Sequence, residues 1–286
     1  MVMRPGLSCP EGHYANNPGP RQMILSEVHQ VFRESEQEGN FLIRIQIPEG
    51  RALAERTFNP KLGIVGGISV LGTTGRVKPM SEEALLETIR LEIHMEAAAG
   101  RSVILMVPGN YGEAFLRERR QVEIGKAVVC SNFVQKAAVY AAEEQISGIL
   151  FAAHIGKLVK VAAGAGNTHS KYGDGRMEQM AELTAGCMKE KGLAEEPVAL
   201  CLTERIRRCN TTEEALGILK EKGIAREVLN LAARRARLSM EQWSGGKVSV
   251  QVMTFSAAYD ILGETEGAEA MLQRWKKQNG WEEAVL

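Results

Sequence analysis

The sequence has few of the features that mark secreted, zinc-bound or membrane-spanning chains. Its five cysteines form no CxxC pair and are odd in number, which argues against a disulfide framework or a structural zinc site. Residues 1–7 lack the apolar stretch of a signal peptide. The longest nearly apolar run, residues 63–72, is about half as long as a membrane-spanning helix requires. We therefore expect a soluble, cytoplasmic protein with no membrane partner.

The sequence also lacks an excess of charge of one sign. It contains 35 basic and 35 acidic residues, so no overall field attracts nucleic acid, and we expect no nucleic-acid partner. Any anionic ligand must then be held by local basic groups. The GxGxxG, P-loop and GxSxG motifs are missing, as is any histidine–carboxylate pattern with metal-ligand spacing. These absences disfavour a dinucleotide oxidoreductase, a hydrolase and a metalloenzyme, and we predict no metal site.

Short apolar segments alternate with helical patterns along much of the chain. Such apolar runs are typical of parallel strands, because helices cover both faces of a parallel sheet. The pattern therefore predicts an α/β fold with a doubly wound, mostly parallel sheet, helices on both faces, and helical additions after about residue 173. The predicted strands are Phe41–Ile47, Gly63–Leu71, Ser102–Val107, Lys126–Cys130, Ile149–Ala153 and Val248–Phe255.

Local signals place three helix starts and suggest a domain boundary. Apolar residues at helical spacing predict a helix from Arg21 to about Gln37. Ser81 can cap a second helix, and Thr211 with Glu214 forms a capping box for a third. Residues 1–17 are rich in proline, glycine and asparagine and predict an irregular lead-in. We expect residues 18–286 to form one α/β domain.

Four loops of unusual composition each follow a predicted strand. They are Gly72–Gly75, Pro108–Gly112, Ser131–Phe133 and His154–Lys157. In doubly wound sheets, ligands bind outside the carboxyl ends of the strands, where such loops converge. Any one of these loops is explained as well by a tight turn. The functional hypothesis therefore depends on all four lying at one edge of one sheet.

The longest polar segment runs from His154 to Arg176. Lys157 and Lys160 lie one helical turn apart, so both could hold carboxylates. His154 and His169 could move a proton near neutral pH. Each side chain also has a structural alternative, namely a hydrogen-bonded histidine or a lysine on a solvated helix face. Arg21, at a predicted helix start, is equally consistent with a carboxylate ligand and with an ordinary surface position.

These same segments resemble a known family. The stretches NNPGPRQMI (16–24), TFNPKLGIVGGISVLGTTG (57–75), PGNYG (108–112), SNFV (131–134), HIGKLVKVAAG (154–164) and NTHSKYGDGRME (167–178) resemble, in order, the CbiD family of cobalt-precorrin-5B C1-methyltransferases. The resemblance implies methylation of ring carbon C1 of cobalt-precorrin-5B to give cobalt-precorrin-6A, in anaerobic cobalamin biosynthesis. The implied methyl donor is S-adenosylmethionine, and the implied substrate is a cobalt-bound tetrapyrrole that carries several carboxylates.

With this reaction as the expectation, the chemistry of the loops suggests candidate roles for residues. Methyl transfer of this kind depends on alignment and charge, so no nucleophilic triad is needed. The candidate catalytic residues are His154 and His169. The candidates for the cofactor are Gly66, Gly67, Gly72, Thr73, Thr74, Gly75, Asn110, Ser131 and Asn132. The candidates for the substrate are Arg21, Lys157, Lys160, Asn167, Ser170 and Arg176. The donor and acceptor sides of this division could be exchanged.

Departures from the family pattern leave several hypotheses open. Family members carry an additional amino-terminal domain that the sequence lacks, so residues 1–17 would be its remnant, and Gln135 and Ala153 stand where the pattern has glycine. The chain could be a methyltransferase that needs a separate amino-terminal-domain chain. It could instead be a noncatalytic subunit that binds a tetrapyrrole or adenosyl ligand, or a degenerate fragment. Assembly as a homo-oligomer is open as well.

Overall fold

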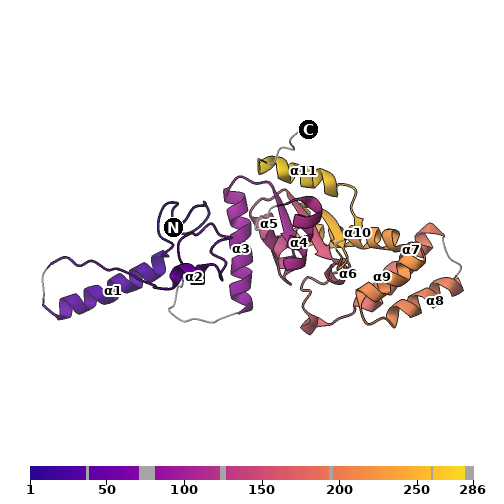
Figure 1. Cartoon of the computed structure of the whole chain (residues 1–286), viewed down its shortest axis with the longest axis horizontal. Coiled ribbons are helices and arrows are strands. Elements are labelled where there is room, and N and C mark those ends of the chain that lie inside the picture. Colours follow the sequence, from indigo (N-terminus) through magenta and orange to yellow (C-terminus); the bar gives the residue numbers. More distant parts are fainter. Residues whose placement is uncertain (37–38, 71–80, 123–126, 193–195, 259, 281–286) are drawn as a thin grey trace. The chain divides into compact units, whose positions relative to one another are not determined.

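The computed structural model describes residues 1–36, 39–70, 81–122, 127–192, 196–258 and 260–280. The chain divides into two compact units, residues 1–99 and residues 100–286 (Figure 1). This division differs from the single domain that the sequence suggests for residues 18–286.

The described residues of the amino-terminal unit form three helices. Helix α1 (Pro18–Glu34) has proline in its first turn, where a missing backbone N–H costs nothing. Helix α2 spans Gly50–Ala54 and helix α3 spans Glu82–Ala98. The Ser81 side chain accepts a hydrogen bond from the backbone N–H of Ala84 at 3.1 Å, which confirms the predicted cap of α3. Met95 of α3 joins a small core that also contains Val2, Cys9, Leu62 and Ile64.

Two predicted strands in this unit are wrong. Residues 41–47 form no strand, and the Phe41 ring packs against His29 of α1, with 4.9 Å between ring centroids. Residues 63–70 make two isolated bridges, Val2 with Ile64 and Asn16 with Val70. The backbone is left-handed at Gly63 (φ +67°) and Gly66 (φ +80°), and such residues interrupt an extended chain. The Gly72–Gly75 loop therefore follows no strand of the main sheet, and it lies outside the described residues.

The carboxyl-terminal unit is built on a five-stranded sheet with the order β2-β1-β3-β4-β5. Strands β1 (Val103–Val107), β2 (Val128–Val129), β3 (Gly148–His154) and β4 (Ser249–Phe255) are parallel. Strand β5 (Ile261–Glu264) pairs antiparallel with β4 at one edge, and the sequence pattern did not indicate it. The other four match predicted apolar runs. The prediction of a mostly parallel sheet is confirmed.

Helices cover both faces of this sheet. Helices α4 (Asn110–Arg120) and α11 (Ala268–Gln278) pack on one face, where Phe115 stacks on Phe255 with 4.4 Å between ring centroids. Helices α5 (Val134–Glu143), α6 (Ile155–Ala162) and α10 (Ala225–Trp243) pack together on the other face (Figure 1). The alternation of side chains along each strand supplies apolar residues to both layers. The doubly wound arrangement is thus confirmed.

A helical layer follows the third strand, as the sequence predicts. A short 3₁₀ turn, η1 (Ser170–Tyr172), leads into helices α7 (Arg176–Lys191), α8 (Glu196–Arg207) and α9 (Thr212–Glu221). Helix α7 packs against α6, α8 and α9. The chain then returns through α10 to the last two strands. Among the described residues, no helix combines the length and the apolar character needed to cross a bilayer.

The start of α9 offers a test of local stability. Thr211 Oγ1 accepts the backbone N–H of Glu214 at 3.1 Å, and the Glu214 carboxylate accepts the N–H of Asn210 at 2.8 Å. We expect Thr211→Ala to lower the free energy of unfolding by about 1 kcal/mol, whereas Thr211→Ser should keep the cap. Urea unfolding followed by tryptophan fluorescence measures this, because all three tryptophans belong to the carboxyl-terminal unit. Equal stability of the two variants would contradict the capping role.

Candidate active site at the carboxyl edge of the sheet

A pocket of about 710 Å³ opens at the carboxyl ends of the parallel strands. Its volume lies in the range of small-molecule sites. The pocket lies where β2 and β3 flank β1 on opposite sides, which is the switch point at which doubly wound folds bind ligands. The lining residues are Pro108, Gly109, Asn110, Tyr111, Gly112, Asn132, His154, Gly156, Lys157, Lys160, Thr168, His169, Ser170, Asp174 and Arg176.

The loop after β1 brings the start of α4 against the sheet. A Cβ at Gly112 would lie 2.6 Å from Cβ of Val107 and 3.0 Å from the carbonyl oxygen of Ala152. Only glycine therefore allows the first turn of α4 to approach β1 and β3 this closely. The turn places Asn110 and Tyr111 at the pocket, and Tyr111 is 65% exposed. Its ring centroid is 6.1 Å from that of His154.

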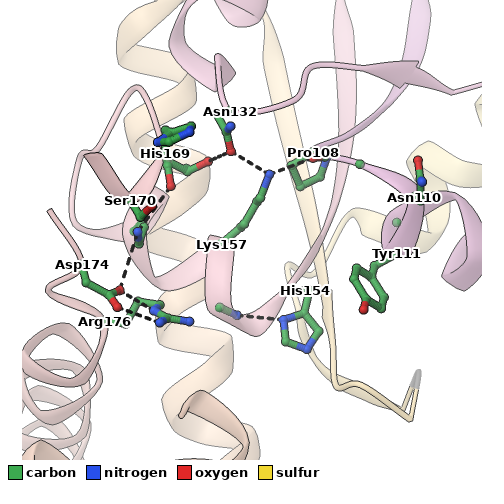
Figure 2. A pocket seen from close by; sticks show the side chains of 15 residues that line it. Pro108, Asn110, Tyr111, Asn132, His154, Lys157, His169, Ser170, Asp174 and Arg176 are labelled. Atoms are coloured by element: carbon green, nitrogen blue, oxygen red, sulfur yellow. Dashed lines mark hydrogen bonds and ion pairs between the residues drawn. The ribbon is translucent and has the colours of Figure 1, made fainter. Parts of the chain in front are cut away.

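Lys157 joins the loops that follow β1 and β2 to helix α6. Its ammonium group donates to the carbonyl oxygen of Pro108 and to Asn132 Oδ1, each at 2.9 Å (Figure 2). It also donates to the carbonyl oxygen of Ser131 at 3.3 Å. An ammonium group has three N–H bonds, so these acceptors match its capacity. Burial lowers the pKa of Lys157. A ligand carboxylate would have to replace one of these oxygen atoms.

The same network extends to the loop before η1. Asn132 Oδ1 also accepts the hydroxyl of Thr168 at 3.2 Å, and the backbone N–H of Thr168 donates to the carbonyl oxygen of Asn132 at 2.9 Å. Lys160 then donates to the carbonyl oxygen of Thr168 at 3.3 Å. The loops after β1, β2 and α6 are therefore connected through side chains on one wall of the pocket.

Asp174 faces two of the candidate substrate-binding residues. Arg176 donates from both Nε and Nη2 to the two oxygens of the Asp174 carboxylate, the second at 2.7 Å. Lys160 Nζ lies 3.6 Å from the same carboxylate. The hydrogen bond from Arg176 lowers the pKa of Asp174 and raises the pKa of Arg176. In the structure, both cations thus already contact an anion.

The two candidate catalytic histidines differ in how their rings are held. His154 Nδ1 accepts the backbone N–H of Gly156 at 3.1 Å, so the neutral ring carries its proton on Nε2, which contacts Glu213 Oε1 at 3.0 Å. Both nitrogens of His154 are therefore engaged within the chain. His169 Nδ1 accepts the N–H of Lys171 at 3.1 Å, which leaves the proton of a neutral ring on Nε2. His169 lies at the pocket and is exposed.

The structure brings together eight of the residues that the sequence suggests for the site. Asn110, Asn132, His154, Lys157, Lys160, His169, Ser170 and Arg176 line the pocket. Ser131 contributes a carbonyl to Lys157, and Asn167 accepts the N–H of His169 at 3.0 Å. Arg21, Gly66 and Gly67 belong to the other unit, whereas Gly72, Thr73, Thr74 and Gly75 lie outside the described residues.

Sequence reasoning missed one residue of the site, Glu213, which holds His154. Tyr111, Thr168 and Asp174 line the pocket and lie within the predicted loop 108–112 and the polar segment 154–176, although none of them was assigned a role of its own. Nothing in the pattern connects Glu213 with a histidine 59 positions away.

Within the described part of the chain, no group of three or more histidine, cysteine or acidic residues could hold a metal ion.

Fold and site together define an α/β protein of the doubly wound type, with a polar, cation-lined pocket at the sheet edge. Comparison with known proteins then identifies the family. Residues 1–79 match the family model CbiD, and residues 167–266 match the model "CbiD, C-terminal domain". The cobalt-precorrin-5B C(1)-methyltransferase of Alkaliphilus metalliredigens is 38% identical over 277 residues, which cover 97% of this chain and 70% of that protein. The chain belongs to the CbiD family.

Other members show the same relation. The cobalt-precorrin-5B C(1)-methyltransferase of Clostridioides difficile is 35% identical over 96% of this chain and 66% of its own length. That of Ruminiclostridium cellulolyticum is 44% identical over 66% of this chain and 50% of its own length. The chain thus spans between half and 70% of the length of these relatives. A solved structure, the cobalamin biosynthesis protein (cbiD) from Archaeoglobus fulgidus, matches at 24% identity over 60% of this chain and 55% of that one, with a TM-score of 0.24.

The contacts of Lys157 lead to a prediction about stability. We expect Lys157→Met to lower the free energy of unfolding of the carboxyl-terminal unit by about 2 kcal/mol, because methionine fills the space but leaves three oxygen atoms without their charged donor. Lys136→Met, on the exposed side of α5, is the matched control and should change little. Urea unfolding followed by tryptophan fluorescence compares them. Equal midpoints for both variants would show that the ammonium group does not hold the loops together.

Proposed function

We propose that this chain acts in the S-adenosylmethionine-dependent methylation of ring carbon C1 of cobalt-precorrin-5B, which gives cobalt-precorrin-6A. The observation that carries the proposal is the alignment of 97% of the chain with a protein named for this reaction. The pocket supports it, because it lies at the switch point of the sheet and combines cations, amides and an exposed aromatic ring. On this proposal the protein works in the cytoplasm, in anaerobic cobalamin biosynthesis.

The chemistry of such a transfer matches what the pocket offers. An electron pair of the ring carbon forms a bond to the methyl carbon of the sulfonium, and the carbon–sulfur bond breaks to leave a neutral thioether. This step needs the two reactants to be aligned and the charge around them to be arranged. The fixed loops after β1, β2 and α6 provide rigid walls for alignment. Lys160 and Arg176 provide positive charge.

We assign the two reactants to different sides of the pocket. Lys160 and Arg176 suit the carboxylates of the tetrapyrrole, since guanidinium and ammonium groups bind carboxylates directly. Asn110 and Tyr111 suit the adenosyl part of the donor, because an exposed aromatic ring stacks on a flat base and an amide bonds to hydroxyls. Arg21, Gly66, Gly67 and the Gly72–Gly75 loop remain predictions for the same ligands.

A reconstituted assay tests the proposed reaction. The relatives extend beyond the aligned segment, so the chain is assayed alone and together with the remaining segment of the Alkaliphilus metalliredigens protein, expressed separately. We expect transfer of a labelled methyl group from S-adenosylmethionine to cobalt-precorrin-5B when both chains are present. Binding of either ligand without transfer under both conditions would favour a noncatalytic binding subunit instead.

The two histidines should behave differently in this assay. We expect His169→Gln to lower kcat, because His169 lines the pocket, is exposed, and could exchange a proton with a ligand. His154→Gln should instead lower the free energy of unfolding by about 1 kcal/mol, since it removes the side-chain cap of α6. Methyl-transfer kinetics and urea unfolding of both variants separate these effects. An unchanged kcat in His169→Gln would remove the catalytic role from that residue.

A further inference from the structure

Asp174 lies at the place in the pocket where a carboxylate of the ligand is expected. The Arg176 guanidinium contacts both of its oxygen atoms, and the Lys160 ammonium lies 3.6 Å from one of them (Figure 2). A planar fork that meets a carboxylate with two parallel hydrogen bonds is the geometry by which arginine recognises this group. The two cations therefore form a carboxylate site, and the chain itself supplies the carboxylate.

The exposure of the three side chains shows which of them form the fixed wall of the pocket. The side chain of Lys160 is 11% exposed and that of Arg176 is 34% exposed, whereas that of Asp174 is 57% exposed. Lys160 projects from α6, and Arg176 is the first residue of α7, so helices fix both positions. Asp174 approaches from the solvent side. An ion pair this exposed contributes little to stability, so its loss costs little.

The Asp174 side chain can change position without a change in the backbone. Lys160 also donates to the carbonyl oxygen of Gly173 at 3.2 Å, and Gly175 accepts the backbone N–H of Gln179 at 3.0 Å, so hydrogen bonds hold the backbone on both sides of Asp174. The Asp174 side chain itself is 57% exposed. Rotation about its own bonds therefore takes the carboxylate into solvent while α6 and α7 keep their places.

We propose that Asp174 is an internal substitute for a ligand carboxylate. It fills the subsite of Lys160 and Arg176 in the free chain and leaves when a carboxylate of the ligand enters. The exchange replaces one anion with another, so the positive charge of the subsite stays neutralised throughout. The identity of the ligand as a tetrapyrrole carboxylate rests on the proposed function.

This exchange makes the subsite selective. The ligand carboxylate must compete with one that is tethered nearby, so it enters only when other contacts already hold the ligand. A permanent structural role for Asp174 makes the opposite prediction. In that case Asp174 would hold the Arg176 fork in position for the ligand, and its removal would weaken binding.

Binding of uroporphyrin III, a tetrapyrrole with acetate and propionate side chains, distinguishes the two roles. Tryptophan quenching at constant salt gives the affinity of the parent and of Asp174→Asn. We expect Asp174→Asn to bind about two- to fivefold more tightly, as the loss of one competing ion pair implies. Asp260→Asn is the matched control, because Asp260 is 55% exposed and lies 3.7 Å from Arg119, and pocket-lining residues do not include it. It removes the same charge and should leave the affinity unchanged.

A second background separates the subsite from a general charge effect. In Arg176→Gln protein, the added substitution Asp174→Asn should no longer strengthen binding, because the fork that both carboxylates share is gone. Equal or weaker binding by Asp174→Asn in the parent background overturns the inference alone. If neither the parent nor Asp174→Asn binds uroporphyrin III, both the carboxylate subsite of Lys160 and Arg176 and the proposed tetrapyrrole substrate are contradicted. Asp174→Ala, which leaves no amide to contact Arg176, repeats the comparison.

Discussion

The pocket depends on the three hydrogen bonds that the Lys157 ammonium group donates. A charged group that is half-buried must find polar partners, because an unpaired charge away from water is costly. Its acceptors are Pro108 O, Ser131 O and Asn132 Oδ1, which come from loops after two different strands. The lysine therefore favours the one arrangement in which those loops lie side by side. That arrangement is also the one that creates the pocket.

The sheet makes this arrangement accessible. Strands β1, β2 and β3 are parallel and adjacent, so their carboxyl ends reach the same edge. Gly112 lets α4 start directly against β1, and the left-handed Ser131 (φ +53°) turns the chain after β2 toward Lys157. From Asn132 the contacts pass to Thr168 and then to Lys160. Local backbone geometry and one half-buried cation thus set the shape of one wall.

The sequence predicted the parts of the fold that follow from apolar runs. The strands at 103–107 and 148–154 are almost entirely buried, so they appear in the sequence as nearly continuous apolar segments. Those at 128–129 and 249–255 are largely buried as well, although the last contains Ser249, Gln251 and Thr254. Residues 41–47 and 63–70 have similar apolar patterns but form no strand of the sheet, because they pack locally or are interrupted by left-handed glycines. Strand β5 was missed because it is four residues long and contains Gly263.

The site was predictable in location but less so in the roles of its side chains. Loops that follow parallel strands converge at one edge of the sheet, so the sequence alone was enough to predict that these loops lie together. The partners of the cations depend on three-dimensional contacts. Lys157 donates to backbone carbonyl oxygens, and Arg176 donates to the Asp174 carboxylate. A sequence pattern cannot tell whether such a cation binds a group of its own chain or is available to a ligand. The same applies to the tautomer of His154, which depends on the N–H of Gly156.

Glu213 has a consequence for how this family can change over evolution. Its Oε1 atom contacts His154 at the end of β3 and accepts the N–H of Ala257 after β4, each at 3.0 Å, although it resides on α9. One carboxylate oxygen thus anchors three segments that are far apart in the chain. A substitution at either member of the His154–Glu213 pair leaves the other without its partner. The two positions are therefore expected to co-vary among homologues, so that an alignment would show them changing together or not at all.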